Sequence, residues 1–165
     1  MVEIREPFAQ ALALAVTETF ENMAFLEVLP GSAAAWDPLA EPPLGVCLPL
    51  LAPVQGVLRL RVPRSLLNTM AATLFLRREE EVDETLRRDL AAELINTLGG
   101  RFLSRLLSPE QPFQLGLPQP LLPPLTEGEQ PGATWYFKAE NLTFALEARG
   151  QALLGLLEQT PLAAE

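Results

Sequence analysis

The chain has 165 residues, of which 48% are hydrophobic, enough for one folded domain with a hydrophobic core. Its net charge of -9 argues against a nucleic-acid partner, because phosphate binding requires a basic surface. It contains no histidine, which excludes histidine-based acid–base catalysis, Ser-His-Asp and Cys-His nucleophiles, and most zinc sites.

The single cysteine and the lack of long apolar runs predict where the protein resides. Cys47 lies in the apolar segment LGVCLPLL, so we expect a buried and unreactive thiol. One cysteine forms no internal disulfide, which is consistent with a reducing cytoplasm. The segment MVEIREPF does not resemble a signal peptide, and no run approaches the roughly 18 apolar residues of a membrane span. We therefore expect a cytoplasmic protein that does not enter a membrane.

The first third of the chain predicts a helix followed by two strands. Apolar residues recur at helical spacing over 6–27, where Pro7 suits the first turn. A loop punctuated by proline and glycine then leads to strand candidates at 44–51 and 54–63, joined by a turn near Pro53. In the second strand, apolar and basic residues alternate between two faces: Leu58, Leu60 and Val62 on one, Arg59 and Arg61 on the other.

Two helices are predicted next. Residues 64–76 follow Pro63 and suit a short helix, and a charged connector leads to a long helix at about 83–107. Asp83 and Glu84 lie in its first turn, where acidic side chains complement the helix dipole. The apolar residues of this helix cover about half of the helical wheel. They are Leu86, Leu90, Ala91, Leu94, Ile95, Leu98, Phe102 and Leu106.

Another side of the long helix carries a small polar group. Asp89, Glu93, Asn96 and Gly100 fall within an arc of roughly 60°, and Thr97 lies beside it. A glycine at position 100 costs about 1 kcal/mol relative to alanine, and it leaves the surface flat enough for another backbone to approach closely. By spacing alone, this face is also compatible with ordinary solvated surface, and the two adjacent glycines with a kink or a close helix contact.

The C-terminal part is predicted to be rich in β structure. Strands, a turn and a closing helix are expected in this order: 113–122, the turn 123–132, 133–140, 142–148 and the helix 151–159. The chain therefore predicts an α/β fold of the α+β sandwich type, in which two long helices and a short helix pack on a mostly antiparallel sheet built from hairpins. No linker divides the chain, so we expect residues 1–165 to form a single domain.

The segment VDETLRRDLAAELINTLGGRFLSRLL resembles the signature of the CheC/CheX/FliY family of chemotaxis phosphatases, which dephosphorylate the response regulator CheY. The family pattern has an Asp-Glu start, a small residue, Glu-x-x-Asn, and a small residue or glycine four positions after the Asn. In this chain these positions are Asp83-Glu84, Ala92, Glu93, Asn96 and Gly100. The strand 54–63, with Gly56, and the helix after it resemble the same family. The resemblance implies a CheX/CheC-like fold over most of the chain.

The resemblance also implies a reaction and a partner. A phosphorylated CheY-like receiver would be the substrate, and Asn96 would orient the water that attacks its phospho-aspartate, since an amide both donates and accepts. Glu93 would pair with the receiver's lysine. Asp89, Thr97 and Gly100 would form the receiver-docking face. No cofactor or metal is expected on this chain, and Mg²⁺ is expected in the receiver.

Some positions depart from the family pattern. The family often has Gly before the Glu and Met after the Asn, where this chain has Ala92 and Thr97. Thr97 keeps open the alternative of a non-catalytic adaptor that binds receivers or resembles the flagellar-switch relatives. CheX-like relatives also form dimers through sheet edges, and the segment TWYFKAENLTFALEA suits an edge strand, so a homodimer is expected.

The first helix carries a degenerate copy of the motif. Some relatives repeat Glu-x-x-Asn there, whereas this chain has Glu18-Thr19-Phe20-Glu21, with Asn22 one residue late. A carboxylate cannot donate to a phosphoryl oxygen and repels it. We therefore expect one active site per chain, as in CheX, with Glu18 and Glu21 as exposed helix charges. Arg101 and Arg105 of the long helix are expected to snorkel from its apolar face.

Overall fold

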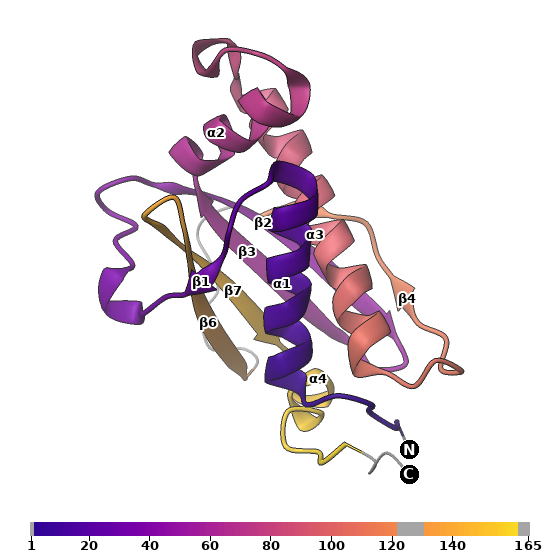
Figure 1. The fold of residues 1–165 in the computed structure, drawn as a ribbon. Coiled ribbons are helices and arrows are strands. Elements are labelled where there is room, and N and C mark those ends of the chain that lie inside the picture. Colours follow the sequence, from indigo (N-terminus) through magenta and orange to yellow (C-terminus); the bar gives the residue numbers. More distant parts are fainter. Residues whose placement is uncertain (1, 122–130, 162–165) are drawn as a thin grey trace.

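The computed structural model describes residues 2–121 and 131–161, which form an antiparallel sheet with helices packed on it (Figure 1). The strands are β1 Leu29–Pro30, β2 Pro43–Ala52, β3 Gly56–Pro63, β4 Gln114–Leu115, β5 Gln119–Pro120, β6 Gly132–Ala139 and β7 Leu142–Arg149. The helices are α1 Phe8–Ala24, α2 Arg64–Phe75, α3 Glu84–Leu106 and α4 Gln151–Gly155, with 3-10 turns η1 Ala33–Ala35 and η2 Glu79–Glu81. The strand order is β1-β6-β7-β3-β2-β4, and β5 pairs with β2. This architecture confirms the predicted α+β sandwich.

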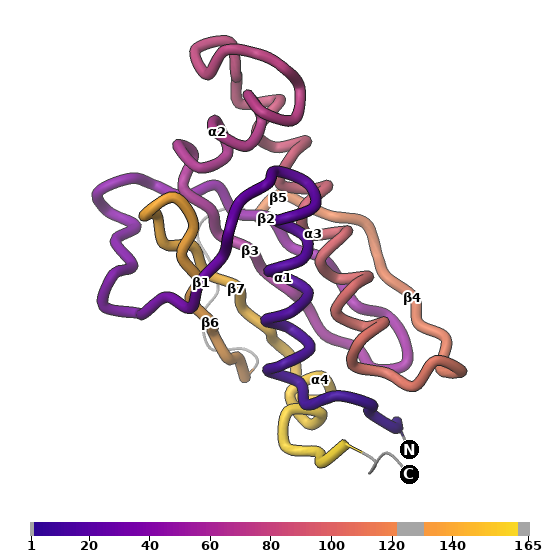
Figure 2. Tube along the Cα trace, in the orientation of Figure 1, coloured from indigo at the N-terminus to yellow at the C-terminus, as the bar shows by residue number. Residues whose placement is uncertain are grey.

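The two long helices, α1 and α3, lie side by side on one face of the sheet and run in opposite directions (Figures 1 and 2). Aromatic contacts join the layers. The ring of Phe8 on α1 meets Phe102 on α3 edge-on, with centroids 4.9 Å apart. The ring of Phe20 stacks on Phe144 of β7 at 4.6 Å. Aromatic contacts therefore hold α1 against α3 and also hold α1 against the sheet.

The central strands separate an apolar face from a polar one. Leu58, Leu60 and Val62 of β3 are fully buried under the helices, while Arg59 and Arg61 point to the opposite side, as predicted. Cys47 corrects one expectation: it is only half-buried, because it lies on the polar side of β2, paired with Arg59 of β3. Burial nonetheless raises the pKa of its thiol, against the opposing effect of the nearby Arg59 charge, so the neutral form is favoured.

Several element boundaries differ from the predicted ones. The first helix spans Phe8–Ala24 instead of 6–27, because Phe25 adopts a left-handed conformation with φ of 57° and ends it. The strand predicted at 113–122 is two short pairings, since Pro118 and Pro120 donate no backbone hydrogen bonds. The closing helix reaches only Gly155. Most of the turn predicted at 123–132 lies outside the described residues.

One edge of the sheet is formed by β1, which was not predicted because two residues carry no periodic signal. It pairs with β6 only at Phe137 and Lys138. The strand β7 is internal, between β6 and β3, so only the β6 half of the expected edge segment lies near an edge. A homodimer through this edge stays a prediction. Within the described part of the chain, no helix is long and apolar enough to cross a membrane.

Candidate functional site

The long helix α3 begins at a side-chain cap. Asp83 is the N-cap residue, and its Oδ1 accepts a hydrogen bond from the backbone N–H of Leu86 at 2.8 Å. The predicted start of the helix is therefore confirmed. Its predicted apolar face is confirmed as well, since Leu90, Leu94 and Phe102 are buried and Leu86 packs partly against the core. Leu103 is buried too, although its place on the wheel did not predict this.

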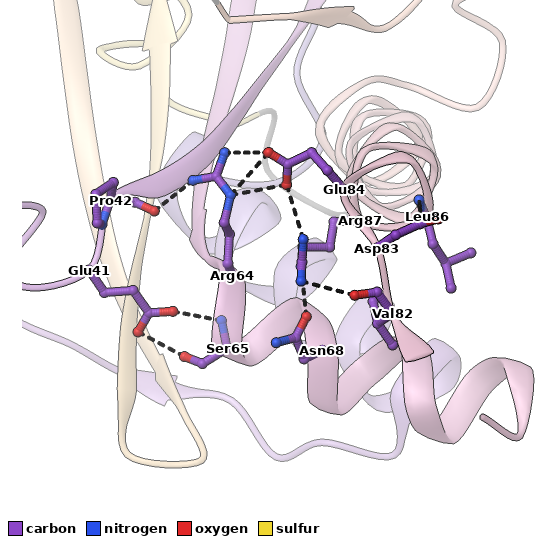
Figure 3. Close-up of polar contacts among 10 residues, drawn as sticks. All are labelled: Glu41, Pro42, Arg64, Ser65, Asn68, Val82, Asp83, Glu84, Leu86 and Arg87. Atoms are coloured by element: carbon purple, nitrogen blue, oxygen red, sulfur yellow. Dashed lines mark hydrogen bonds and ion pairs between the residues drawn. The ribbon is translucent and has the colours of Figure 1, made fainter. Parts of the chain in front are cut away.

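The first turn of α3 is tied to the start of α2 by an ion-pair network (Figure 3). Glu84 accepts two hydrogen bonds from the Nε of Arg64 and one from its Nη2, the last at 2.8 Å. Arg87 lies 3.4 Å from the same carboxylate and also donates to Asn68 of α2 at 2.7 Å. These cations lower the pKa of the Glu84 carboxyl and, in return, Glu84 raises the pKa of the Arg64 guanidinium.

The loop before β2 joins this network. Glu41 accepts hydrogen bonds from the backbone N–H of Ser65 at 2.6 Å and from its hydroxyl at 2.9 Å, which satisfies a free donor at the start of α2. Arg64 also donates to the carbonyl of Pro42 at 2.8 Å. Figure 3 shows that these contacts join three segments distant in sequence. The helix that carries the candidate site is thus held at its N-terminal end as well as along its buried face.

The polar face of α3 points away from the core. Asp89, Glu93 and Asn96 are exposed, and Thr97 and Gly100 are half-buried. Within residues 2–121 and 131–161, no hydrogen bond or ion pair engages the side chain of Glu93 or of Asn96. The two residues are three positions apart, about 4.5 Å along the helix axis. The helix therefore offers an unengaged carboxylate and an unengaged amide on one rigid surface.

The two adjacent glycines have different surroundings. A Cβ at Gly99 would lie 2.4 Å from Cδ2 of Leu48, so glycine there lets β2 pack tightly against α3. This is a close helix–sheet contact, one of the kinds of explanation that the sequence left open. A Cβ at Gly100 would meet nothing within 4 Å. Packing within the described chain therefore accounts for Gly99 but not for Gly100, which lies on the same face as Glu93.

The degenerate motif on α1 is engaged in packing and ion pairs. Glu18 forms ion pairs with Arg101, at 3.3 Å, and with Arg105 of α3. Arg105 also lies 3.3 Å from Glu6. The expectation for Glu18 was therefore wrong: it is half-buried and paired, and the two arginines bridge α1 and α3 instead of only snorkelling. Glu21 is exposed, as expected.

A groove lies beside the polar face and was not predicted. It has a volume of about 340 Å³ and is lined on the helix side by Arg88 and Ala92. Its other walls come from 42–46, Arg64 of α2 and 118–121, so no local pattern in the sequence could indicate it. Neither Glu93 nor Asn96 lines this groove or the three other main pockets of the described part of the chain. That part also holds no group of three or more acidic or cysteine side chains placed to bind a metal ion.

Three solved structures that share this fold are distant from the chain in sequence. The CheX protein of Vibrio vulnificus superposes with a TM-score of 0.68 at 16% identity, covering 88% of this chain and 97% of that one. A CheC-like protein from Shewanella sp. PV-4 gives 0.66 at 19% identity, over 86% and 96%. The CheX–CheY–BeF₃–Mg²⁺ complex of Borrelia burgdorferi gives 0.65 at 14% identity, over 88% and 98%. No curated protein matches the chain.

The family assignment comes from the sequence itself. The family model described as chemotaxis phosphatase CheX matches residues 44–133, more than half of the chain. This region runs from β2 through the whole of α3, so it includes Glu93, Asn96 and the pairing of Arg64 and Arg87 with Glu84 that holds the start of their helix. The resemblance stated from the motif is confirmed. The chain belongs to the chemotaxis phosphatase CheX family.

Proposed function

We propose that this chain accelerates the hydrolysis of the aspartyl-phosphate of a CheY-like receiver domain, with α3 as the helix that enters the receiver's site. The observation that carries the proposal is the exposed pair Glu93 and Asn96, which the described chain leaves unengaged on a helix fixed at one end and along its core face. Membership of a phosphatase family supports the reaction class. The Borrelia structure, in which a CheX protein is crystallised with CheY, supports the partner class.

Asn96 would act on the attacking water. Its side-chain amide has an oxygen that accepts and an NH₂ group that donates, so it can hold a water molecule in line with the phosphorus atom. No covalent intermediate on this chain is needed, because positioning a water removes much of the entropic cost of hydrolysis. A protein without histidine can perform this step, since no proton needs to be transferred to a side chain of this chain.

Glu93 would fix the register of docking. Its carboxylate lies nearly one turn before Asn96, on the same face, and would pair with a lysine of the receiver. Asp89, Thr97 and Gly100 would border the contact, and the open space at Gly100 would allow the receiver's backbone to approach. We propose that this chain binds no cofactor or metal of its own and that the Mg²⁺ of the reaction belongs to the receiver.

The test is phosphate release from a purified, phosphorylated CheY-like receiver, measured with and without this protein. We expect acceleration by the parent and a loss of about 100-fold or more for Asn96→Ala. Glu93→Ala should instead weaken binding, with a larger change in the half-saturating concentration than in the maximal rate. The matched control is Asn22→Ala, which removes an exposed asparagine of α1 and should leave the rate unchanged.

Two results would contradict the proposal in different ways. If acceleration survives Asn96→Ala, the site is wrongly placed and Asn96 is ordinary helix surface. If the receiver binds the parent through Glu93 but its phosphate is lost no faster, the chain is a receiver-binding adaptor, the alternative that Thr97 keeps open.

A further inference from the structure

The face of the sheet away from α1 and α3 carries a cluster of arginines. Strand pairing places Arg59 of β3 opposite Glu147 of β7, and Arg61 opposite Ala145. Arg149 lies two residues after Glu147 and therefore on the same face. The cluster is on the other side of the sheet from Glu93 and Asn96, so it is separate from the proposed phosphatase site.

Small side chains leave a hollow between these arginines. Ala145 lies between Arg61 of β3 and Tyr136 of β6, its two cross-strand partners. A methyl group beside two long side chains cannot fill the space that they span. The resulting pocket has a volume of about 290 Å³, and Trp36 also lines it. Its volume is near the lower end of the range of small-molecule sites, roughly 300–1,000 Å³.

The charges in this pocket are only partly balanced. Glu147 pairs with Arg59 at 3.4 Å and with Arg149 at 2.5 Å. The three side chains are largely buried: that of Arg59 is 18% exposed, that of Glu147 13% and that of Arg149 15%. Among the described lining residues, three guanidinium groups therefore face one carboxylate. Glu147 is shared by Arg59 and Arg149, so no carboxylate among the described lining residues is left for Arg61.

Two N–H groups of the cluster are buried without an acceptor. The Nε of Arg59 and one terminal nitrogen of Arg61, Nη2, have no solvent exposure and no hydrogen-bond partner in the described structure. No ion pair engages Arg61 within the described residues either. A buried donor without an acceptor costs about 1–3 kcal/mol, and more when it is charged. An acceptor that enters the pocket would remove this cost.

We propose that this pocket binds a small molecule through a phosphate group. A phosphate group would supply the acceptors that the buried N–H groups of Arg59 and Arg61 lack, and its oxygens match the N–H geometry of guanidinium groups. The rings of Trp36 and Tyr136, with centroids 6.3 Å apart, lie at the pocket. These rings can contact an organic part attached to the phosphate. The site thus takes a phosphorylated small molecule, with the anion on Arg59 and Arg61.

The test measures binding of inorganic phosphate and of phenyl phosphate by calorimetry, at fixed ionic strength, to the parent and to Arg61→Gln. Arg61 has no ion-pair partner among the described residues that the change would leave behind, so this variant should fold at least as stably as the parent. We expect its affinity for both ligands to fall about tenfold or more, the loss of one charge-assisted hydrogen bond. Arg77→Gln, at an exposed position after α2, removes the same charge and should bind as the parent does.

The two ligands distinguish the possible sources of the phosphate group. Tighter binding of phenyl phosphate, lost in Trp36→Ala, would assign an organic phosphate, and equal binding would assign the free ion. Binding can also be followed on the parent itself, by recording the nuclear magnetic resonance signals of the arginine Nε–Hε groups as phosphate is added. The Arg59 signal should shift, and the Arg77 signal should not. The proposal would be overturned if the parent bound neither ligand at concentrations on the order of 10 mM, or if Arg61→Gln bound them with the parent's affinity.

Discussion

Glu18 of α1 and Arg101 of α3 form an ion pair at 3.3 Å across the two helices that cover the sheet. Glu18 is the first residue of the degenerate motif, the counterpart of Glu93. Its carboxylate also pairs with Arg105, so it is directed toward α3, whereas Glu93 is exposed. The two related positions therefore differ in their partners as well as in the missing amide.

Glu18→Gln should weaken the fold without weakening the phosphatase. The variant loses the charge that bridges Arg101 and Arg105, and ion pairs of partly exposed groups contribute about 1 kcal/mol or less each. We expect the free energy of unfolding in urea to fall by about 1 kcal/mol, with the rate of receiver dephosphorylation within twofold of the parent. A rate loss as large as that of Glu93→Ala would show instead that α1 carries a second site.

Gly99→Ala should destabilise the protein. The new methyl group would lie 2.4 Å from Cδ2 of Leu48, so the leucine must move out of its position in the core. Overpacking of this kind costs about 1–3 kcal/mol, and the better helix propensity of alanine offsets about 1 kcal/mol of it. A net loss of about 1 kcal/mol or more in urea unfolding is expected. Equal or higher stability would mean that α3 and β2 have free space between them.

Gly100→Ala is the matched opposite case. Apart from the adjacent residues and the backbone of α3 itself, no atom lies within 4 Å of the position that its Cβ would take, so only the gain in helix propensity remains. We expect the free energy of unfolding to rise by about 1 kcal/mol. Gly100→Leu should fold equally well but slow receiver dephosphorylation, because its side chain would stand on the proposed docking face. A Gly100→Leu variant with the parent's rate would remove Gly100 from that face.

The start of α3 should respond to pH through Glu84. Arg64 lowers the pKa of the Glu84 carboxyl in the folded protein, so the folded state binds this proton less readily than the unfolded state. The stabilisation is therefore present above the unfolded pKa of about 4.3 and is lost as the pH falls through the lower, folded pKa. We expect the stability difference between the parent and Glu84→Gln to be larger at pH 7 than near pH 3. An equal difference at both values would contradict the pairing with Arg64.

Local patterns predicted the register of α3 but not what surrounds it. The 3.6-residue period placed Leu90, Leu94 and Phe102 inside and Glu93 and Asn96 outside, because a long helix on a sheet has one buried side. Leu103 is also buried, although it lies outside the apolar arc that this period predicted. The groove beside Ala92 could not be predicted either, because its walls come from four parts of the chain: 42–46, Arg64, the α3 residues Arg88 and Ala92, and 118–121.

The ion pairs of α1 show the same limit. Glu18 and Arg101 are 83 positions apart, and no spacing rule connects them. From the sequence, Glu18 was an exposed charge and Arg101 a snorkelling one, which is the usual state of such residues on a helix surface. Only the antiparallel arrangement of α1 and α3 brings them together. By contrast, the alternation of Leu60 with Arg59 and Arg61 could be read directly, because strand residues alternate whatever lies on either face.

Asn96→Asp tests whether Asn96 acts through its amide or only through its shape. Aspartate has nearly the same size, but its carboxylate has no N–H to donate and repels the phosphoryl group. We expect phosphate release to fall by about 100-fold or more, as for Asn96→Ala, while Asn22→Asp on α1 leaves the rate unchanged. The fold should tolerate both changes, because both side chains are exposed. A rate close to that of the parent in Asn96→Asp would exclude an amide-held water. If Asn96→Gln retained activity and Asn96→Asp did not, the reaction would require the N–H donor of the side-chain amide. Glutamine keeps this amide on a longer side chain, whereas aspartate lacks it.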